Sequence, residues 1–364
     1  MKERIVIKVG SNVLARPDGS IDVTRLSSLS DQVALLLKDG KEVILVSSGA
    51  VACGRSMLKP ERKLDSVEQR QLYSAIGQVR LMNLYYKLFA EHGIKIGQVL
   101  TMKESFSTRT EYLNQRSCME VMLRSGVVPI VNENDTVSVT ELMFTDNDEL
   151  SSLVASMMGA STLVILSNVD GIFTGHPSDP ESRLIKEVKP DEDLSAYIKE
   201  DKSSLGRGGM SSKFASARNA AQEGIRVMIA CGKREGVVTD LFRDPDSVPH
   251  TTFIPAEGMS GIKKWIGRSS DFAKGSVHIN ANAAKALTGE DAVSLLMVGV
   301  TSVDGDFEEG DIIDIFDEEG RMVAVGRAGY SSEEGRKLVG VHDVKPMVHY
   351  DYLYIEGRND GRFQ

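Results

Sequence analysis

The stretch IVNENDTVSVTELMFTDNDELS, residues 130–151, decides the fold. It begins within residues 127–131, an apolar and largely β-branched run that predicts a buried strand. It ends where apolar residues begin to recur at helical spacing, so the polar residues 146–149 lie at a helix entrance. Helix capping alone would explain Asp146. Two polar clusters flanked by apolar walls favour instead a site for a small charged ligand.

Strands and helices alternate through most of the chain. The expected strands are 4–9, 42–46, 94–100, 127–131, 162–166 and 226–230. Helical patterns separate most of them, which predicts an α/β fold, a three-layer αβα sandwich with a mainly parallel sheet. In such sheets, ligands bind beyond the carboxyl ends of the strands. Polar or glycine-rich breaks follow several of these strands, so they predict one shared site.

The last quarter of the chain has a different pattern. Its short strand-like runs, separated by glycines, are 276–280, 294–301, 311–316, 322–327 and 349–355. They predict a small β-rich, barrel-like domain. Residues 276–364 carry 8 Lys/Arg and 17 Asp/Glu, whereas the rest of the chain carries 35 of each. This shift predicts a catalytic domain at 1–257, a linker at 258–275 that contains Trp265, and a domain at 276–364.

Composition excludes several classes of protein. The N-terminal apolar run is too short for a signal peptide, and no segment approaches a membrane span. Cys53, Cys118 and Cys231 lie far apart among small or apolar residues, which favours buried free thiols and a cytoplasmic location. The six histidines show no metal-ligand spacing. The acidic C-terminal domain is a poor candidate for binding RNA.

Basic and glycine-rich elements point to an anionic ligand. Lys8 lies in an apolar strand, where its charge is costly unless it meets an anion. The turn 47–50 follows the second strand and offers backbone N–H groups to a carboxylate or phosphate. The loop 204–213 is rich in glycine and ends with Lys213 in the first turn of a helix, but it is neither a P-loop nor a dinucleotide fingerprint. Two lysines, two such turns and a carboxylate cluster suit phosphoryl transfer, which needs positioning and charge stabilisation.

Five segments carry a resemblance to a known family. IVIKVGSNVL (5–14), LVSSGAVACGR (45–55), VNEND (131–135), FTDNDELS (144–151) and GRGGMSSK (206–213) occur in this order and spacing. They resemble the amino acid kinase superfamily, and within it the glutamate 5-kinase family. The C-terminal part resembles the PUA domain that many bacterial members carry.

The resemblance implies a reaction and assigns roles by position. ATP would phosphorylate the γ-carboxylate of L-glutamate to give L-glutamyl 5-phosphate, the first step of proline biosynthesis. Lys8 and Lys213 would flank the transferring phosphoryl group, and Asp148 would hold both lysines. The residues implied to bind glutamate are Ser48, Asp135 and Asn147. Those implied to line the nucleotide site are Lys8, Ser167, Asn168, Arg207, Gly208, Gly209, Met210, Ser211, Ser212 and Lys213.

The resemblance also implies cofactors and partners. Mg²⁺ would bridge the phosphates of ATP, proline would act as a feedback inhibitor, and the chain would form a homo-dimer or tetramer. Functional coupling to glutamyl-phosphate reductase is a further expectation. Asn168 and Arg207 depart from the family pattern, where Asp and Thr are common, and both departures concern nucleotide contacts.

Two alternatives remain open at this point. The chain could be another superfamily member that acts on aspartate, N-acetylglutamate, carbamate or UMP. It could also be a non-catalytic sensor of amino acid and nucleotide with an RNA-associated PUA domain. The VNEND segment and the C-terminal domain favour glutamate, and the presence of Lys8, Asp148 and Lys213 speaks against a non-catalytic fold.

Overall fold

The structure is a computed structural model of the chain. It describes residues 2–106, 109–137, 146–177, 179–190, 192, 194, 209–256, 273–289 and 293–355. The chain divides into two compact units, Met1–Lys103 with Arg116–Ala256, and Glu104–Gln115 with Glu257–Gln364. The expected boundaries at 257 and 276 stay a prediction, and Trp265 of the proposed linker lies outside the described residues.

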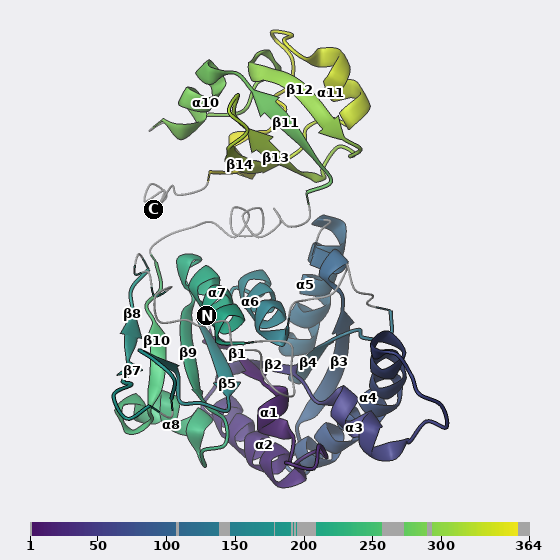
Figure 1. Cartoon of the computed structure of the whole chain (residues 1–364), viewed down its shortest axis with the longest axis vertical. Helices are drawn as coiled ribbons and strands as arrows, with labels where there is room; N and C mark the ends of the chain where they lie inside the picture. Colours follow the sequence, from purple (N-terminus) through teal and green to yellow (C-terminus); the bar gives the residue numbers. More distant parts are fainter. Residues whose placement is uncertain are drawn as a thin grey trace. The chain divides into compact units, whose positions relative to one another are not determined.

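The first unit is built on an eight-stranded sheet (Figure 1). In spatial order its strands are β3 (Lys95–Thr101), β4 (Val127–Glu133), β2 (Glu42–Ser47), β1 (Arg4–Val9), β5 (Thr162–Ser167), β9 (Arg226–Cys231), β10 (His250–Phe253) and β8 (Glu187–Val188). The first six strands in this order, β3, β4, β2, β1, β5 and β9, run parallel to one another. β10 pairs antiparallel with β9 and parallel with β8. A two-stranded ribbon joins β6 (Ile172–Phe173) and β7 (Leu184–Ile185). The mainly parallel α/β sheet is therefore confirmed.

Helices cover both faces of this sheet, as Figure 1 shows. The helices of the unit are α1 (Ser11–Leu14), α2 (Val23–Lys38), α3 (Ala50–Met57), α4 (Ser66–Ala90), α6 (Asn147–Met157), α7 (Met210–Gln222) and α8 (Val237–Arg243), and α5 spans Arg109–Arg124. Helix α2 packs with α4 and α8, and α6 packs with α7 and β1. No helix among the residues described is both long enough and apolar enough to cross a membrane.

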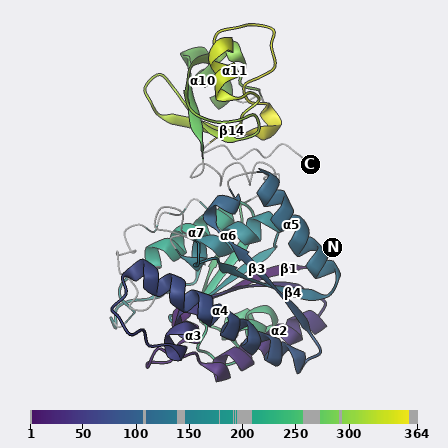
Figure 2. The same ribbon diagram turned by 90° about the vertical axis from the view of Figure 1, so that its right-hand side faces the viewer.

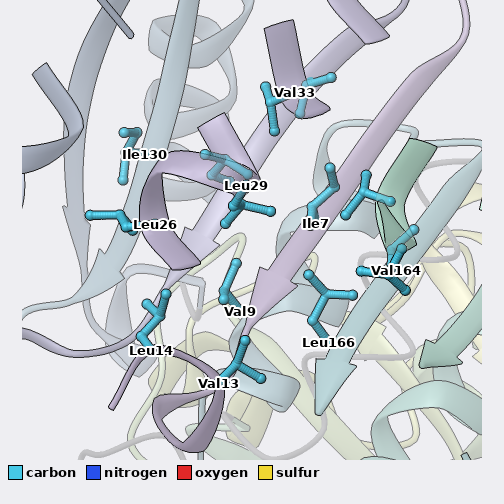
Figure 3. Packing of buried hydrophobic residues seen from close by; sticks show 14 of the residues in the cluster. Ile7, Val9, Val13, Leu14, Leu26, Leu29, Val33, Ile130, Val164 and Leu166 are labelled. Atoms are coloured by element: carbon cyan, nitrogen blue, oxygen red, sulfur yellow. The ribbon is translucent and has the colours of Figure 1, made fainter. Parts of the chain in front are cut away.

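The core of this unit fills the space between the sheet and α1 and α2. Figure 3 shows Ile7 and Val9 of β1 beside Val164 and Leu166 of β5, with the side chains of α2 packed on them. The apolar side chains labelled there are fully or almost fully buried. Burial of large aliphatic groups contributes about 1.5–3 kcal/mol each, so this layer holds β1 rigidly in the centre of the sheet.

Two glycines allow α3 and α4 to pack closely, and Figure 2 shows the two helices side by side. A Cβ atom at Gly54 would lie 1.9 Å from the carbonyl oxygen of Tyr73, and one at Gly77 would lie 1.8 Å from that of Ala50. No side chain larger than hydrogen fits at either position. The close packing fixes the first turns of α4 beside the turn that follows β2.

The second unit is a five-stranded sheet with its own core. The order is β12 (Val300–Gly305), β11 (Gly275–Ile279), β13 (Ile312–Phe316), β14 (Met322–Arg327) and β15 (Leu353–Ile355), and only β11 and β13 run parallel. Helices α10 (Ala281–Thr288) and α11 (Ser332–Leu338) accompany it. Val277, Ile279, Ile313 and Ile315 are buried in its core. The β-rich character of this region is confirmed.

Three expectations are wrong in detail. The strand expected at 294–301 begins only at Val300, because Met297–Gly299 forms a 3₁₀ turn that buries Met297 and exposes Leu296, which imitates strand alternation. The strand expected at 349–355 begins at Leu353, after a 3₁₀ turn at Tyr350–Tyr352. All three cysteines are free, but only Cys53 is buried as expected: Cys118 on α5 is exposed and Cys231 is partly buried.

Candidate functional site

A cavity of about 530 Å³ lies at the carboxyl ends of β1, β2, β4 and β5. Each strand contributes residues at or just after its last position, as expected for a doubly covered parallel sheet. The cavity is lined by Lys8, Gly10, Ser11, Asn12, Val13, Ala15, Gly19, Ser48, Gly49, Ala50, Val51, Ala52, Arg55, Ser66, Gln69, Arg70, Asn132, Glu133, Asp135, Asp146, Asn147, Asp148, Leu166, Ser167, Asn168 and Lys213. The site residues predicted from both polar clusters therefore share one cavity.

Asp148 is held between two lysines at this cavity. Lys8 Nζ lies 2.5 Å from Asp148 Oδ1, and Lys213 Nζ lies 3.0 Å from Oδ2. Asp148 is completely buried, and Lys8 nearly so. Burial alone would raise the pKa of Asp148, but the two ammonium groups outweigh it and lower that pKa below its usual range. The triad thus carries one carboxylate and two ammonium groups, and the carboxyl group of Asp146 lies beside them.

Three different elements bring this triad together. Lys8 lies on β1 opposite Val46 of β2 and Ile165 of β5, so it has neighbours on both sides. Asp148 and Lys213 lie in the first turns of α6 and α7. A Cβ atom at Gly10 would lie 3.1 Å from the carbonyl oxygen of Leu166 and 3.5 Å from Lys8 Nζ. Glycine at that position therefore leaves the lysine end group accessible from the cavity.

Asp146 ties the N-termini of α6 and α7 together. Its Oδ1 accepts hydrogen bonds from the backbone N–H of Asp148 at 2.8 Å and of Glu149 at 3.1 Å, so Asp146 caps α6, the role that the sequence left as the alternative to a ligand site. Its Oδ2 accepts a hydrogen bond from the hydroxyl of Ser212 on α7. Burial, together with the nearby Asp148, raises the pKa of Asp146. The same carboxylate thus fixes the two helix ends that carry Asp148 and Lys213.

Asn147 connects the carboxyl ends of β2 and β4. Its Nδ2 donates to the carbonyl oxygen of Ser47 at 2.8 Å, to Ser48 Oγ at 2.9 Å and to Asn132 Oδ1 at 3.2 Å. Gly49 begins α3 with φ of 104°, in the left-handed region that favours glycine. Ser48, Asn147 and the start of α3 therefore surround one part of the cavity.

Asp135 forms the second charged centre of the cavity. Arg70 Nε of α4 lies 3.4 Å from Asp135 Oδ1, and both side chains are about nine-tenths buried, with 10% and 14% exposed. Burial raises the pKa of Asp135 to about 6, against the opposing charge of Arg70. This carboxyl group is therefore much more readily protonated than Asp148.

Arg70 is absent from the residues predicted by sequence. Within α4 it belongs to the buried stripe that continues with Tyr73, Gly77 and Leu81. A charged residue on the apolar face of an amphipathic helix is the pattern that could have identified it. Its position at the end of that stripe directs it into the cavity, which Ser66 and Gln69 of the same helix also line.

The expected nucleotide residues are described in part. Ser167 ends β5 and Asn168 follows it, both line the cavity, and Ser167 Oγ lies 3.4 Å from Asn168 Oδ1. Gly209 precedes α7, which begins at Met210 and carries Ser211, Ser212 and Lys213 in its first turn. Arg207 and Gly208 lie outside the residues that the structure describes. The start of α7 thus supplies Lys213, one of the two lysines of the triad.

The chemistry of the cavity suits a metal that arrives with its ligand. Within the described ranges no group of three His, Cys, Asp or Glu side chains could hold a metal ion. Both oxygens of Asp148 already face lysines. Mg²⁺ commonly takes one or two protein carboxylates together with substrate phosphates and water, so phosphates could provide most of its ligands here.

Comparisons with known proteins place the chain in a family. The model of the amino acid kinase family matches residues 3–231, and that of the PUA domain matches residues 275–350. A glutamate 5-kinase from Bacteroides thetaiotaomicron is 59% identical and covers 97% of this chain and 98% of its own length. One from Chlorobaculum tepidum is 44% identical, with 97% of each chain covered.

Among solved structures, the carbamate kinase from Giardia lamblia bound to AMP-PNP has a TM-score of 0.51 and 16% identity. It covers 70% of this chain and 99% of its own. At that identity the likeness shows the fold alone. The chain belongs to the amino acid kinase family and, within it, to the glutamate 5-kinases.

Proposed function

We propose that this enzyme transfers the γ-phosphoryl group of ATP to the γ-carboxylate of L-glutamate, giving L-glutamyl 5-phosphate and ADP, the first step of proline biosynthesis. The observation that carries the proposal is the buried Lys8–Asp148–Lys213 triad at the cavity of a glutamate 5-kinase family member. A carboxylate oxygen of glutamate attacks the γ-phosphorus while the bond to the β–γ bridging oxygen breaks. The attacking carboxylate is already ionised, so no general base is needed.

Lys8 and Lys213 neutralise charge on the transferring phosphoryl group, and Asp148 positions both of them. Phosphoryl transfer spreads negative charge over the equatorial oxygens, so fixed cations stabilise the transition state. Asp148 keeps a low pKa and remains ionised, and therefore holds the lysines throughout the working pH range. The triad is positive overall, which also favours binding of the polyanionic substrate.

Ser48, Asp135 and Asn147 bind glutamate in this proposal. Asp135 is the partner of the α-ammonium group, because it is an ionisable carboxylate at a distinct part of the cavity lining. Asn147 already donates to Ser48 Oγ, and both residues present polar atoms beside the amino end of α3. An N–H-rich helix start beside hydroxyl and amide groups suits a carboxylate.

The nucleotide occupies the part of the site that the glutamate-binding residues Ser48, Asp135 and Asn147 do not form. Lys8, Ser167, Asn168 and Lys213 line the cavity, and Gly209–Ser212 directly precede Lys213 at the start of α7. Arg207 and Gly208, which the structure does not describe, would complete the loop. Mg²⁺ bound to the phosphates supplies additional positive charge on the transferring group.

Another acceptor is the main competing function. The carbamate kinase likeness extends only to the fold, so the acceptor must be tested directly. We would measure ADP release from Mg-ATP with L-glutamate, L-aspartate, N-acetylglutamate, carbamate and UMP in parallel, with hydroxylamine to trap an acyl phosphate. We expect ADP release and hydroxamate formation with glutamate. Turnover with a different acceptor would move the substrate assignment, and ATP binding without any turnover would favour a sensor.

Three further properties belong to the same proposal. Proline inhibits at the glutamate site, the chain forms a homo-dimer or tetramer, and glutamyl-phosphate reductase receives the labile product. Light scattering of the full chain with and without proline, combined with the proline dependence of ADP release, tests the first two. Unchanged glutamate kinetics at high proline would remove the inhibitor from this account.

A further inference from the structure

Arg70 is a buried cation in the cavity lining to which the proposed mechanism gives no role. It comes from α4, whereas the side chains of the triad come from β1, α6 and α7. Its Nε lies 3.4 Å from Asp135 Oδ1. A tight hydrogen bond between a cation and a carboxylate is about 2.8 Å long, so this contact is an ion pair at a longer distance.

The other cations of the described lining lie in different surroundings. Lys8 and Lys213 both pair with Asp148. Arg55 is exposed, and its guanidinium lies 5.8 Å from the centre of the Tyr73 ring. Arg70 and Asp135 therefore present a buried pair of opposite charges at the cavity, on the side of β4 and α4.

A free α-amino acid carries the complementary pair of charges on one carbon atom. We propose that Arg70 binds the α-carboxylate of the amino acid substrate while Asp135 binds its α-ammonium group. The planar fork of a guanidinium group matches a carboxylate with two parallel hydrogen bonds, which gives orientation as well as affinity. This inference rests on the proposed function and assigns a residue that recognises the acceptor.

The position of the pair suits an acceptor with a second, distant carboxylate. Asp135 follows β4 and Lys8 lies on β1, with β2 between them in the sheet. Two strand spacings correspond to about 10 Å. A five-carbon amino acid anchored at its α-carbon can reach roughly that far when it makes a hydrogen bond at each end. The γ-carboxylate would then meet the phosphoryl group beside the triad.

Two analogues separate the two halves of this recognition. 4-Aminobutyrate lacks the α-carboxylate of glutamate, and glutarate lacks its α-ammonium group. We would measure the KM for glutamate and the competitive inhibition constants of both analogues, well above the pKa of Asp135, about 6. The variants are Arg70→Met, Arg70→Lys and Asp135→Asn. Arg80→Met, an exposed arginine on the same helix, is the matched control.

Arg70→Met should weaken the binding of glutamate and of glutarate by roughly 10- to 100-fold, because both lose the contact to their carboxylate. It should leave 4-aminobutyrate and kcat within a few-fold of wild type. Asp135→Asn should instead weaken the binding of glutamate and of 4-aminobutyrate and leave the binding of glutarate unchanged. Arg70→Lys should restore part of the affinity, since it keeps the charge without the fork.

Equal losses of affinity for glutamate and for 4-aminobutyrate in Arg70→Met would overturn the inference, because Arg70 would then act only through Asp135. A normal glutamate KM in that variant would overturn it as well. Thermal unfolding of every variant identifies loss of fold, and Arg70→Lys provides the second test if Arg70→Met is unfolded. Wild-type turnover of glutamate is measured first, so failure of the proposed function is seen before any variant is compared.

Discussion

Two buried carboxylates in one cavity have pKa values shifted in opposite directions. Asp148 is fully buried, yet its two lysine partners lower its pKa. Asp135 is slightly less buried and faces Arg70 at 3.4 Å, and its pKa rises to about 6. The number and closeness of the cations, rather than burial, decide the sign of the shift. In the proposed mechanism, Asp148 would belong to a permanently charged centre for phosphoryl transfer and Asp135 to a titratable centre for substrate recognition.

The largest effect is expected for Asp148→Asn. It removes the negative charge between two lysines and should lower turnover by roughly 10³-fold, because both cations lose their position. It should also lower the free energy of unfolding by about 3 kcal/mol, since breaking a buried ion pair leaves uncompensated charge. Steady-state kinetics and denaturant unfolding measure the two effects.

Glu42→Gln is the matched control, because Glu42 forms an ion pair with Arg4 at the opposite end of the sheet. Turnover of Asp148→Asn within a few-fold of this control would remove the triad from the mechanism.

A smaller loss is expected for Lys213→Ala. Lys8 and Asp148 remain paired, so we expect turnover to fall by roughly 10²-fold, with a smaller change in the KM for glutamate. Lys41→Ala, whose lysine pairs with Glu3 away from the cavity, serves as the control. A Lys213→Ala enzyme that keeps wild-type turnover but loses glutamate affinity would reverse the tasks assigned to the two centres.

Asp135→Asn should lower the affinity for glutamate and raise the free energy of unfolding. The folded state binds a proton at Asp135 more tightly than the unfolded state, because the pKa rises from 3.8 to about 6. The stability that this proton provides is complete below pH 3.8 and is lost as pH rises through about 6. The ligand-free variant should therefore be more stable by up to about 3 kcal/mol at neutral pH, with no difference in acid.

Denaturant unfolding of wild type and variant at both pH values measures this difference. A variant that is less stable than wild type at neutral pH would show that the Arg70 pair outweighs the burial of Asp135.

Removal of residues 276–364 should have the smallest effect. All described residues that line the cavity belong to the first unit, so both charged centres should persist. We expect kcat and KM to remain within a few-fold of the full chain. A truncated protein with a cooperative unfolding transition but no activity would show that the PUA domain contributes to catalysis.

Sequence reasoning predicted the fold well where strands were long and uniform. β1 and β14 have the predicted bounds, because valine and isoleucine in β1 and valine in β14 mark each run as a strand and polar or glycine-rich residues border it. β8 and β10 were not predicted, since two and four residues are too few to show a period. Their antiparallel placement comes from pairing between distant segments, which no local pattern encodes.

For the site, the sequence predicted residues at strand ends and helix starts and missed Arg70, which lies on the buried stripe of α4. Lys8, Asp148 and Lys213 come together because strand ends and helix starts share one edge of the sheet. Arg70 could not be paired with Asp135 from sequence, because the direction of α4 depends on its close packing with α3 at Gly54 and Gly77.

The pH profile of kcat/KM for glutamate tests the division between the two centres most directly, because it reports groups of the free enzyme. We would measure it by ADP release in wild type and in Asp135→Asn. We predict that the wild-type value falls about tenfold per pH unit below a pKa of about 6, as Asp135 becomes protonated, and that the variant lacks this limb. The same limb in both proteins, or no limb in wild type, would contradict the account.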